Sequence, residues 1–246
     1  MKQIVLFNGT KEPDGKSSYG GRYVARTLTS TGYSAECRYS TNPDEYVVGW
    51  GFEHPRAVLN GDPRRGKFQE LTILHRAGIP VPPHSRQWRD HWLGRAEHHT
   101  GGQDLLNPPD TPGYWVKFLD TVLEYRVHVF WYPDKLPRTK LAVRWMRGDE
   151  AHPWMRNTWE HGWTDLYDQG SITQLTIRFG VDITQITAQA TKAVQAMGYT
   201  FSAVDIAWTK EATPVVWEVN SQPYIPGPET ARFYANGILA WYKETQ

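Results

Sequence analysis

The sequence predicts an α+β protein in which a short α/β unit comes before a larger mixed unit. Apolar strand patterns alternate with a helical pattern near the N-terminus, and further helical patterns follow. Near the C-terminus, two apolar strands are separated only by a short polar turn, which is typical of an antiparallel hairpin. A chain of 246 residues is long enough to bury a sizeable core in one large domain or two small ones.

The first unit is predicted to hold one helix and three strands. Its expected elements, in order, are a strand at 2–7, a glycine-rich loop at 8–21, a helix at 22–30, and strands at 34–39 and 46–50. The stretch 61–66 is rich in turn residues and marks a break. We therefore expect an N-terminal α/β unit over 1–66 and a second domain over 67–246.

The second unit begins with a helix over 67–77 that ends at Gly78, a common C-cap residue. Asp182 and Gln185 resemble a capping box, so a second helix is expected to begin after Asp182. The remaining expected elements are strands at 114–119, 123–131, 141–146, 204–208 and 215–219, and a terminal helix at 229–242.

The overall composition excludes several classes of protein. The chain has 27 basic and 26 acidic residues, so no excess of positive charge indicates nucleic-acid binding. A single cysteine, Cys37, excludes an intramolecular disulfide and fits a reducing compartment. No apolar stretch has the length of a membrane span or a signal peptide. We expect a soluble, cytoplasmic protein without a membrane partner.

The C-terminal hairpin carries the most informative polar residues. Glu218 and Asn220 are two residues apart and share a face, and Asp205 on the other strand can join them. The apolar residues expected on the opposite face are Val204, Ile206, Trp208, Val215, Trp217 and Val219. Adjacent acids are costly without a cation, and Mg²⁺ prefers oxygen ligands, so we interpret this face as a metal site. The alternative is a solvated sheet face.

The strand over 123–131 places a second polar row on one face. Glu124, Arg126 and His128 alternate with apolar residues there. This row is either an exposed face or one wall of a polar cleft, in which Arg126 could bind a phosphate or carboxylate bidentately.

Several other polar residues could contact a ligand. The loop containing Thr100, Gly101 and Gly102 could bring backbone N–H groups to phosphates, although most such loops are turns. Lys117 and Arg144 lie within predicted strands, where they either protect a sheet edge or reach a nucleotide. Three residues of a polar, irregular segment are further potential ligand contacts, with a solvated loop as the alternative: Arg156, Asn157 and His161.

Taken in order, these segments resemble the ATP-grasp fold, and most of all its glutamate-ligase-like carboxylate–amine ligases. The resemblance runs from about residue 67 to residue 239. Its most specific part is an Asp on one strand and Glu-x-Asn on the next, followed by a Ser/Ala-x-Pro turn, here Asp205 and 218–223. The resemblance implies two α+β subdomains that clamp ATP. It also implies that Asp205, Glu218 and Asn220 hold Mg²⁺ at the ATP phosphates.

The resemblance implies roles for other residues. Arg95 falls where the family has a phosphate-binding Lys, and the segment 100–102 falls on the glycine-rich lid over the phosphates. Lys117 falls on the strand that brings a lysine to the nucleotide. Arg126 would contact the phosphate or acyl-phosphate, and the pair Arg156 and Asn157 would lie near the metal and the transferred phosphoryl group. Arg95 departs from the family's lysine, and the N-terminal unit is shorter than the family's first domain.

The activity that the resemblance implies is an ADP-forming carboxylate–amine ligase that uses ATP and Mg²⁺, or Mn²⁺ in its place. A small-molecule or peptide carboxylate would form an acyl-phosphate, which an amine then attacks. His128 and His161 are both open as the base for the amine. A phosphotransferase and a non-catalytic nucleotide-binding protein are the alternatives, and the oligomeric state is open.

Overall fold

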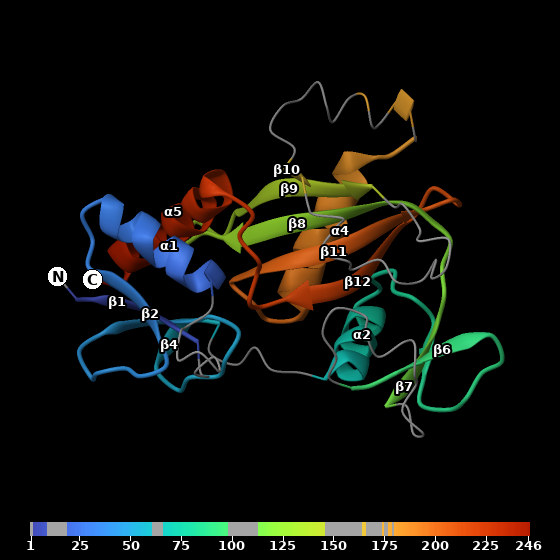
Figure 1. The fold of residues 1–246 in the computed structure, drawn as a ribbon, viewed down its shortest axis with the longest axis horizontal. Helices are drawn as coiled ribbons and strands as arrows, with labels where there is room; N and C mark the ends of the chain where they lie inside the picture. Colours follow the sequence, from blue (N-terminus) through green and yellow to red (C-terminus); the bar gives the residue numbers. More distant parts are fainter. Residues whose placement is uncertain are drawn as a thin grey trace.

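The structure is a computed structural model that describes residues 2–8, 19–60, 66–97, 113–145, 164–165, 174, 177–178 and 180–246. The described residues form three sheets, one parallel and two antiparallel, with helices packed against them (Figure 1). No described helix is long and apolar enough to cross a membrane. This architecture agrees with the α+β class expected from the sequence.

The N-terminal sheet is four-stranded and parallel, in the order β2-β1-β3-β4. Its elements are β1 (Ile4–Phe7), α1 (Tyr19–Ser30), β2 (Ala35–Arg38), β3 (Tyr46–Gly49) and β4 (Ala57–Leu59). The expected strands and helix are present, and β4 was not predicted. Helix α1 packs against the C-terminal helix α5 (Pro228–Glu244), so the two ends of the chain lie together (Figure 1).

A small three-stranded sheet follows helix α2 (Lys67–Arg76) in the chain. Its strands β5 (His84–Ser85), β6 (Trp92–Arg95) and β7 (Tyr114–Lys117) run antiparallel in the order β5-β7-β6. Leu71 of α2 packs with Tyr114 and Val116 of β7. This contact holds α2 against the small sheet.

The largest sheet is antiparallel and five-stranded, in the order β10-β9-β8-β11-β12. Its strands are β8 (Thr121–Trp131), β9 (Pro137–Trp145), β10 (Thr164–Asp165), β11 (Phe201–Thr209) and β12 (Pro214–Asn220). Helix α4 (Ile183–Ala196) covers one face, where its buried residues pack against Val127, Val204 and Ile206. The predicted cap is confirmed, since the Asp182 carboxylate accepts hydrogen bonds from the backbone N–H groups of Thr184 and Gln185.

The apolar pattern of the hairpin differs from the expected strict alternation. The register shifts between Asp205 and Ile206, so Asp205 pairs with Glu218 while Ile206 pairs with Val216. The extra residue reverses the alternation, and Val216 rather than Val215 joins the core beneath α4. For the same reason Trp217 leaves that core and packs against the cluster at the small sheet. The expectation for Val215 and Trp217 was therefore wrong.

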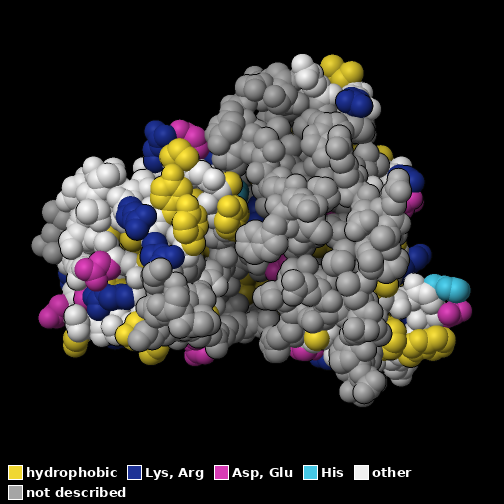
Figure 2. All heavy atoms as spheres, in the orientation of Figure 1, with side chains coloured by type: hydrophobic (Ala, Val, Ile, Leu, Met, Phe, Trp, Pro, Cys, Tyr) yellow, Lys and Arg dark blue, Asp and Glu magenta, His cyan; other side chains and the backbone are white. Residues whose placement is uncertain are grey.

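A second core joins the N-terminal sheet to the large sheet. Leu6 and Trp50 lie in the same buried cluster as Phe130 of β8, Phe201 of β11 and Tyr234 of α5. Figure 2 shows lysine, arginine, aspartate and glutamate side chains interspersed over the N-terminal part of one face of the molecule. This mixture fits the nearly balanced charge of the chain.

Candidate functional site

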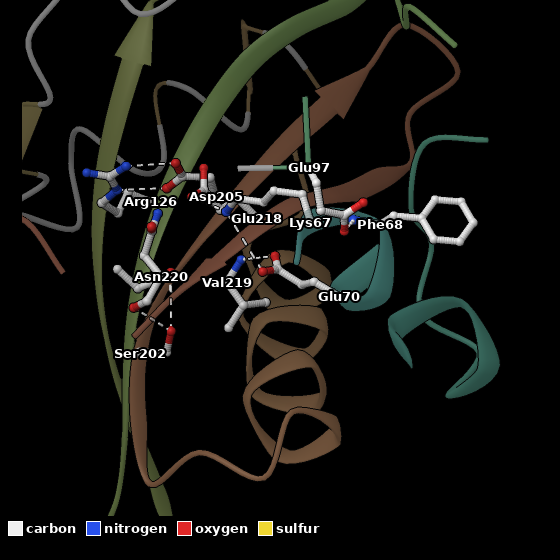
Figure 3. A network of polar contacts seen from close by, with 11 residues as sticks. Lys67, Phe68, Glu70, Glu97, Arg126, Ser202, Asp205, Glu218, Val219 and Asn220 are labelled. Carbon is white, nitrogen blue, oxygen red and sulfur yellow. Dashed lines mark hydrogen bonds and ion pairs between the residues drawn. The ribbon is translucent and has the colours of Figure 1, made fainter. Parts of the chain in front are cut away.

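Three neighbouring strands bring charged side chains together on one face of the large sheet. Asp205 of β11 is the register partner of Arg126 on β8 and of Glu218 on β12. Directly opposed residues lie on the same face of a sheet. The structure therefore brings together three of the residues singled out in the sequence, at the centre of the network in Figure 3.

Arg126 and Asp205 form a two-pronged ion pair. The Nε and Nη2 atoms of Arg126 each donate to one oxygen of Asp205, both at 2.7 Å. The side chains are only 11% and 16% exposed. Burial by itself would lower the pKa of Arg126, but the Asp205 carboxylate outweighs it and raises that pKa. Arg126 is thus held charged at the site.

Asn220 lies two residues beyond Glu218, at the end of β12. Its backbone carbonyl accepts a hydrogen bond of 2.7 Å from the Ser202 hydroxyl. Figure 3 shows its side-chain amide pointing toward Arg126 and Asp205. The three residues predicted as metal ligands thus lie around one point of the sheet.

Helix α2 adds two residues that the sequence analysis did not single out. The Lys67 amine forms an ion pair with Glu218 and lies 3.8 Å from the Glu70 carboxylate. Burial by itself would lower the pKa of Lys67, but Glu218 and Glu70 outweigh it and raise that pKa. Burial raises the pKa of Glu70 to about 7. The helical spacing predicted α2, but no local signal shows that its first turn meets β12.

The first turn of α2 is fixed by Glu97, which follows β6. The Glu97 carboxylate accepts from the Phe68 backbone N–H at 3.2 Å, and its carbonyl accepts from the Lys67 N–H at 3.2 Å. Gly66 precedes the helix and has no side chain to cap it. Glu97 therefore takes over the capping and holds Lys67 in place.

Arg95 and Lys117 occupy different parts of the small sheet. Arg95 pairs with Tyr114, whereas Lys117 pairs with Trp92 at the other end of the same strands. Burial raises the pKa of Tyr114 to about 12, and the charges of Arg95 and Lys67 oppose that rise. Arg95 shares a face with its register partner Tyr114, which packs with Leu71 of α2, so Arg95 lies on the α2 side of the small sheet. Lys117 is exposed and three residues along β7 from Tyr114, so it projects from the opposite face.

The remaining predicted contacts are only partly described. The backbone of Arg144 pairs with Glu124, two positions along the ladder from the pairing of Arg126, but the Arg144 side chain lies outside the described part of the chain. Six predicted residues lie entirely outside the described residues: Thr100, Gly101, Gly102, Arg156, Asn157 and His161.

His128 is fully buried beneath helix α5. Its Nδ1 atom forms a hydrogen bond of 2.9 Å with the Tyr234 hydroxyl. Burial, reinforced by the charges of Arg126 and Lys140, lowers its pKa well below the ordinary value. A histidine with no exposed surface cannot meet an incoming amine, so its position favours a packing role over that of the base.

The donor set fits a magnesium ion that is also bound by phosphates. No group of three or more Asp, Glu, His or Cys side chains suited to a metal occurs among the described residues. The site instead offers two carboxylates and one amide, with Arg126 and Lys67 beside the acids. Mg²⁺ is commonly held by one or two carboxylates together with substrate phosphates and water. The residues present therefore fit such an ion.

Comparison with known proteins identifies the fold. No protein-family model matches the sequence, and no curated protein matches it. Among solved structures, the chain is similar to the ATP-grasp ligase PsnB complexed with minimal precursor, Mg and ADP, at 13% identity and a TM-score of 0.58. That match covers 98% of this chain and 98% of PsnB. The chain has the ATP-grasp fold.

Two other solved structures agree with this identification. N5-carboxyaminoimidazole ribonucleotide synthetase from Thermotoga maritima matches 98% of this chain and 75% of its own, with 14% identity and a TM-score of 0.61. L-amino acid ligase from Bacillus licheniformis matches 96% of this chain and 70% of its own, with 12% identity and a TM-score of 0.60. Both matches extend over the N-terminal sheet as well as the residues from 67 onward.

Proposed function

We propose that the protein is an ATP- and Mg²⁺-dependent carboxylate–amine ligase that forms ADP. The observation that carries this proposal is the pairing of Asp205 with Glu218 beside two cations, Arg126 and Lys67, in a chain with the ATP-grasp fold. Paired carboxylates beside two fixed cations are suited to binding a metal ion with a nucleotide, and this arrangement favours a binding site over a solvated sheet face.

Asp205, Glu218 and Asn220 would hold Mg²⁺, or Mn²⁺ in its place. The ion, when bound, would neutralise charge on the ATP phosphates. Lys67 and Arg126 already lie beside the two carboxylates, so entering phosphates would compete for the same cations. In this proposal Arg126 orients the phosphoryl group as it passes to the substrate carboxylate, and Lys67 compensates the negative charge.

Most of the other predicted contacts are part of the proposal. Arg95, Thr100, Gly101, Gly102 and Arg144 would bind the nucleotide, and Arg156 and Asn157 would act at the transferred phosphoryl group. Lys117 projects from the opposite face of the small sheet, so it is left out of the proposed site. The substrate carboxylate attacks the γ-phosphorus of ATP, and the bond from that phosphorus to the oxygen of the β-phosphate breaks, which gives the acyl-phosphate and ADP. The amine then attacks the acyl carbon, and phosphate leaves. Most of the rate enhancement would come from positioning and charge stabilisation.

The substrates belong to the class of small-molecule or peptide carboxylates and amines. Support comes from the names of two similar structures, one complexed with a minimal precursor and the other an L-amino acid ligase. The carboxylate and the amine substrate are to be identified by screening.

A two-stage experiment tests the proposal. Mg·ATP should raise the melting temperature of the wild-type protein, because a ligand that binds only the folded state stabilises it. Carboxylate and amine mixtures are then screened for ADP release, with mass spectrometry of the products. An amide product supports the ligase, whereas a stable phosphorylated acceptor would indicate a kinase. The absence of a Mg·ATP-dependent shift would contradict both activities.

A further inference from the structure

Glu70 is a buried carboxylate that touches two parts of the candidate site. Its residue is only 4% exposed. The Oε1 atom accepts a hydrogen bond of 2.6 Å from the Val219 backbone N–H, and the Oε2 atom lies 3.8 Å from the Lys67 amine. Figure 3 shows the Glu70 carboxylate directed at Val219, between Glu218 and Asn220 in the chain.

The contact with Val219 occurs on the outer edge of the large sheet. In the described part of the chain, β12 pairs with β11 on one side only. On its other side, the Val216 N–H donates to the Pro80 carbonyl at 2.8 Å, and the Val219 N–H donates to Glu70. In a regular strand, N–H groups on one edge come from every second residue. Here the two outward N–H groups, of Val216 and Val219, are three residues apart because Trp217 is an extra residue in β12.

The register shift determines where the site carboxylate points. Because Trp217 is the extra residue, Glu218 lies opposite Asp205; in an unbroken register Trp217 would lie there instead. The hydrogen bonds from Val216 to Pro80 and from Val219 to Glu70 lie on either side of the extra residue. Each bond therefore fixes one end of the irregular segment. Without Glu70, the Val219 N–H would be a buried donor that has no other acceptor among the described residues on that edge.

We propose that Glu70 is a positioning residue that holds the 218–220 segment and Lys67 in the arrangement needed to bind Mg·ATP. This inference rests on the proposed function, because it assigns Glu70 to the same site. Glu70 acts through Val219 and Lys67, since one of its oxygens accepts from the Val219 N–H and the other lies 3.8 Å from the Lys67 amine.

Two variants separate positioning from simple packing. Glu70→Ala removes both contacts, whereas Glu70→Gln keeps a carbonyl oxygen that can accept from Val219. In Glu70→Ala, amide hydrogen exchange at Val219 should be faster by about tenfold or more, as expected for the loss of one buried hydrogen bond. The Val216 amide is the internal control, because its acceptor is the Pro80 carbonyl. Equal exchange at Val219 in wild type and Glu70→Ala would overturn the proposal.

Calorimetric titration with Mg·ATP supplies the functional measurement. We expect about tenfold weaker binding for Glu70→Ala and rescue to within about threefold for Glu70→Gln, since one hydrogen bond corresponds to roughly that ratio. Equal weakening in both variants would overturn positioning through the acceptor oxygen, and undiminished affinity in Glu70→Ala would overturn the role itself. If the wild-type protein bound no Mg·ATP, the proposed function would fail. Faster Val219 exchange in Glu70→Ala would in that case still support the contact between Glu70 and Val219.

A second measurement covers the case in which Glu70→Ala does not fold. At a pH well above 7, where Glu70 is ionised, Glu70→Gln replaces a charge-assisted bond to Val219 by a neutral one, so the amide chemical shift of Val219 should move while that of Val216 stays unchanged. No movement at Val219 would overturn the proposal without any need for the alanine variant.

Discussion

At the scale of single residues, the ion pair between Arg126 and Asp205 is the clearest electrostatic feature of the site. Both side chains are largely buried, so removing one leaves an uncompensated charge. Arg126→Ala should destabilise the fold by about 3 kcal/mol, because breaking a buried pair costs roughly that amount. Asp205→Ala should do likewise, and the double variant should lose less than the sum of the two. Urea unfolding of the four proteins measures this coupling, and strictly additive losses would contradict it.

His128 should make stability depend on pH. Burial holds its pKa well below the ordinary value of about 6.5, so folded His128 stays neutral where the unfolded chain takes up a proton. The depressed pKa means that this stability is fully present above pH 6.5 and is lost as the pH falls. The expected slope approaches 1.4 kcal/mol per pH unit at most, which is about one proton. Urea unfolding between pH 7 and pH 5.5 should show a flatter dependence for His128→Gln, and parallel curves would contradict the prediction.

At the scale of elements, the docking of α5 on β8 depends on the absence of a side chain at Gly237. A Cβ atom there would lie 2.6 Å from the Phe130 ring. Phe130 is fully buried and stacked on Phe201 at 5.3 Å, so its ring cannot move aside. Gly237→Ala should cost roughly 1–3 kcal/mol through overpacking, more than the gain of up to about 1 kcal/mol in helix propensity.

The neighbouring residue supplies the control for Gly237. Asn236 is exposed on the same helix, so Asn236→Ala should be neutral or slightly stabilising. Thermal unfolding of both variants makes the comparison. A melting temperature for Gly237→Ala equal to that of Asn236→Ala would show that the helix can shift to admit the methyl group.

At the scale of the whole molecule, one hydrophobic core crosses the predicted boundary at residue 66. Leu6 and Trp50 pack with Phe130, Phe201 and Tyr234, and Asn60 donates a hydrogen bond of 2.8 Å to the Phe201 carbonyl. The division into 1–66 and 67–246 remains a prediction about folding units. The shared core makes the two units interdependent in stability.

A fragment of residues 67–246 tests this interdependence. Deleting the N-terminal sheet would expose the aromatic cluster on β8, β11 and α5, so we expect the fragment to unfold at a lower temperature and to bind a hydrophobic dye. The full chain is the control. Equal melting temperatures for fragment and full chain would contradict the prediction and favour two independent domains.

Local sequence signals predicted the features that depend on neighbours in the chain. The cap at Asp182 and the antiparallel hairpin were both expected and are present. The side-chain alternation within the hairpin failed at Val215 and Trp217, because a period of two holds only in a strand without a bulge. A bulge is set by packing on both edges of the strand, which the local pattern does not contain.

The candidate site likewise combines features that the sequence determines with features that only the tertiary structure decides. By itself, the sequence determined the acidic hairpin, the polar row on β8 and the order of segments that resembles the ATP-grasp fold, because residue spacing within a strand decides which side chains share a face. Only the tertiary structure brought Lys67 to Glu218 and Glu70 to Val219, which are 151 and 149 positions apart in the chain. Such contacts depend on how α2 docks against the edge of β12, and that docking results from the packing of the whole core.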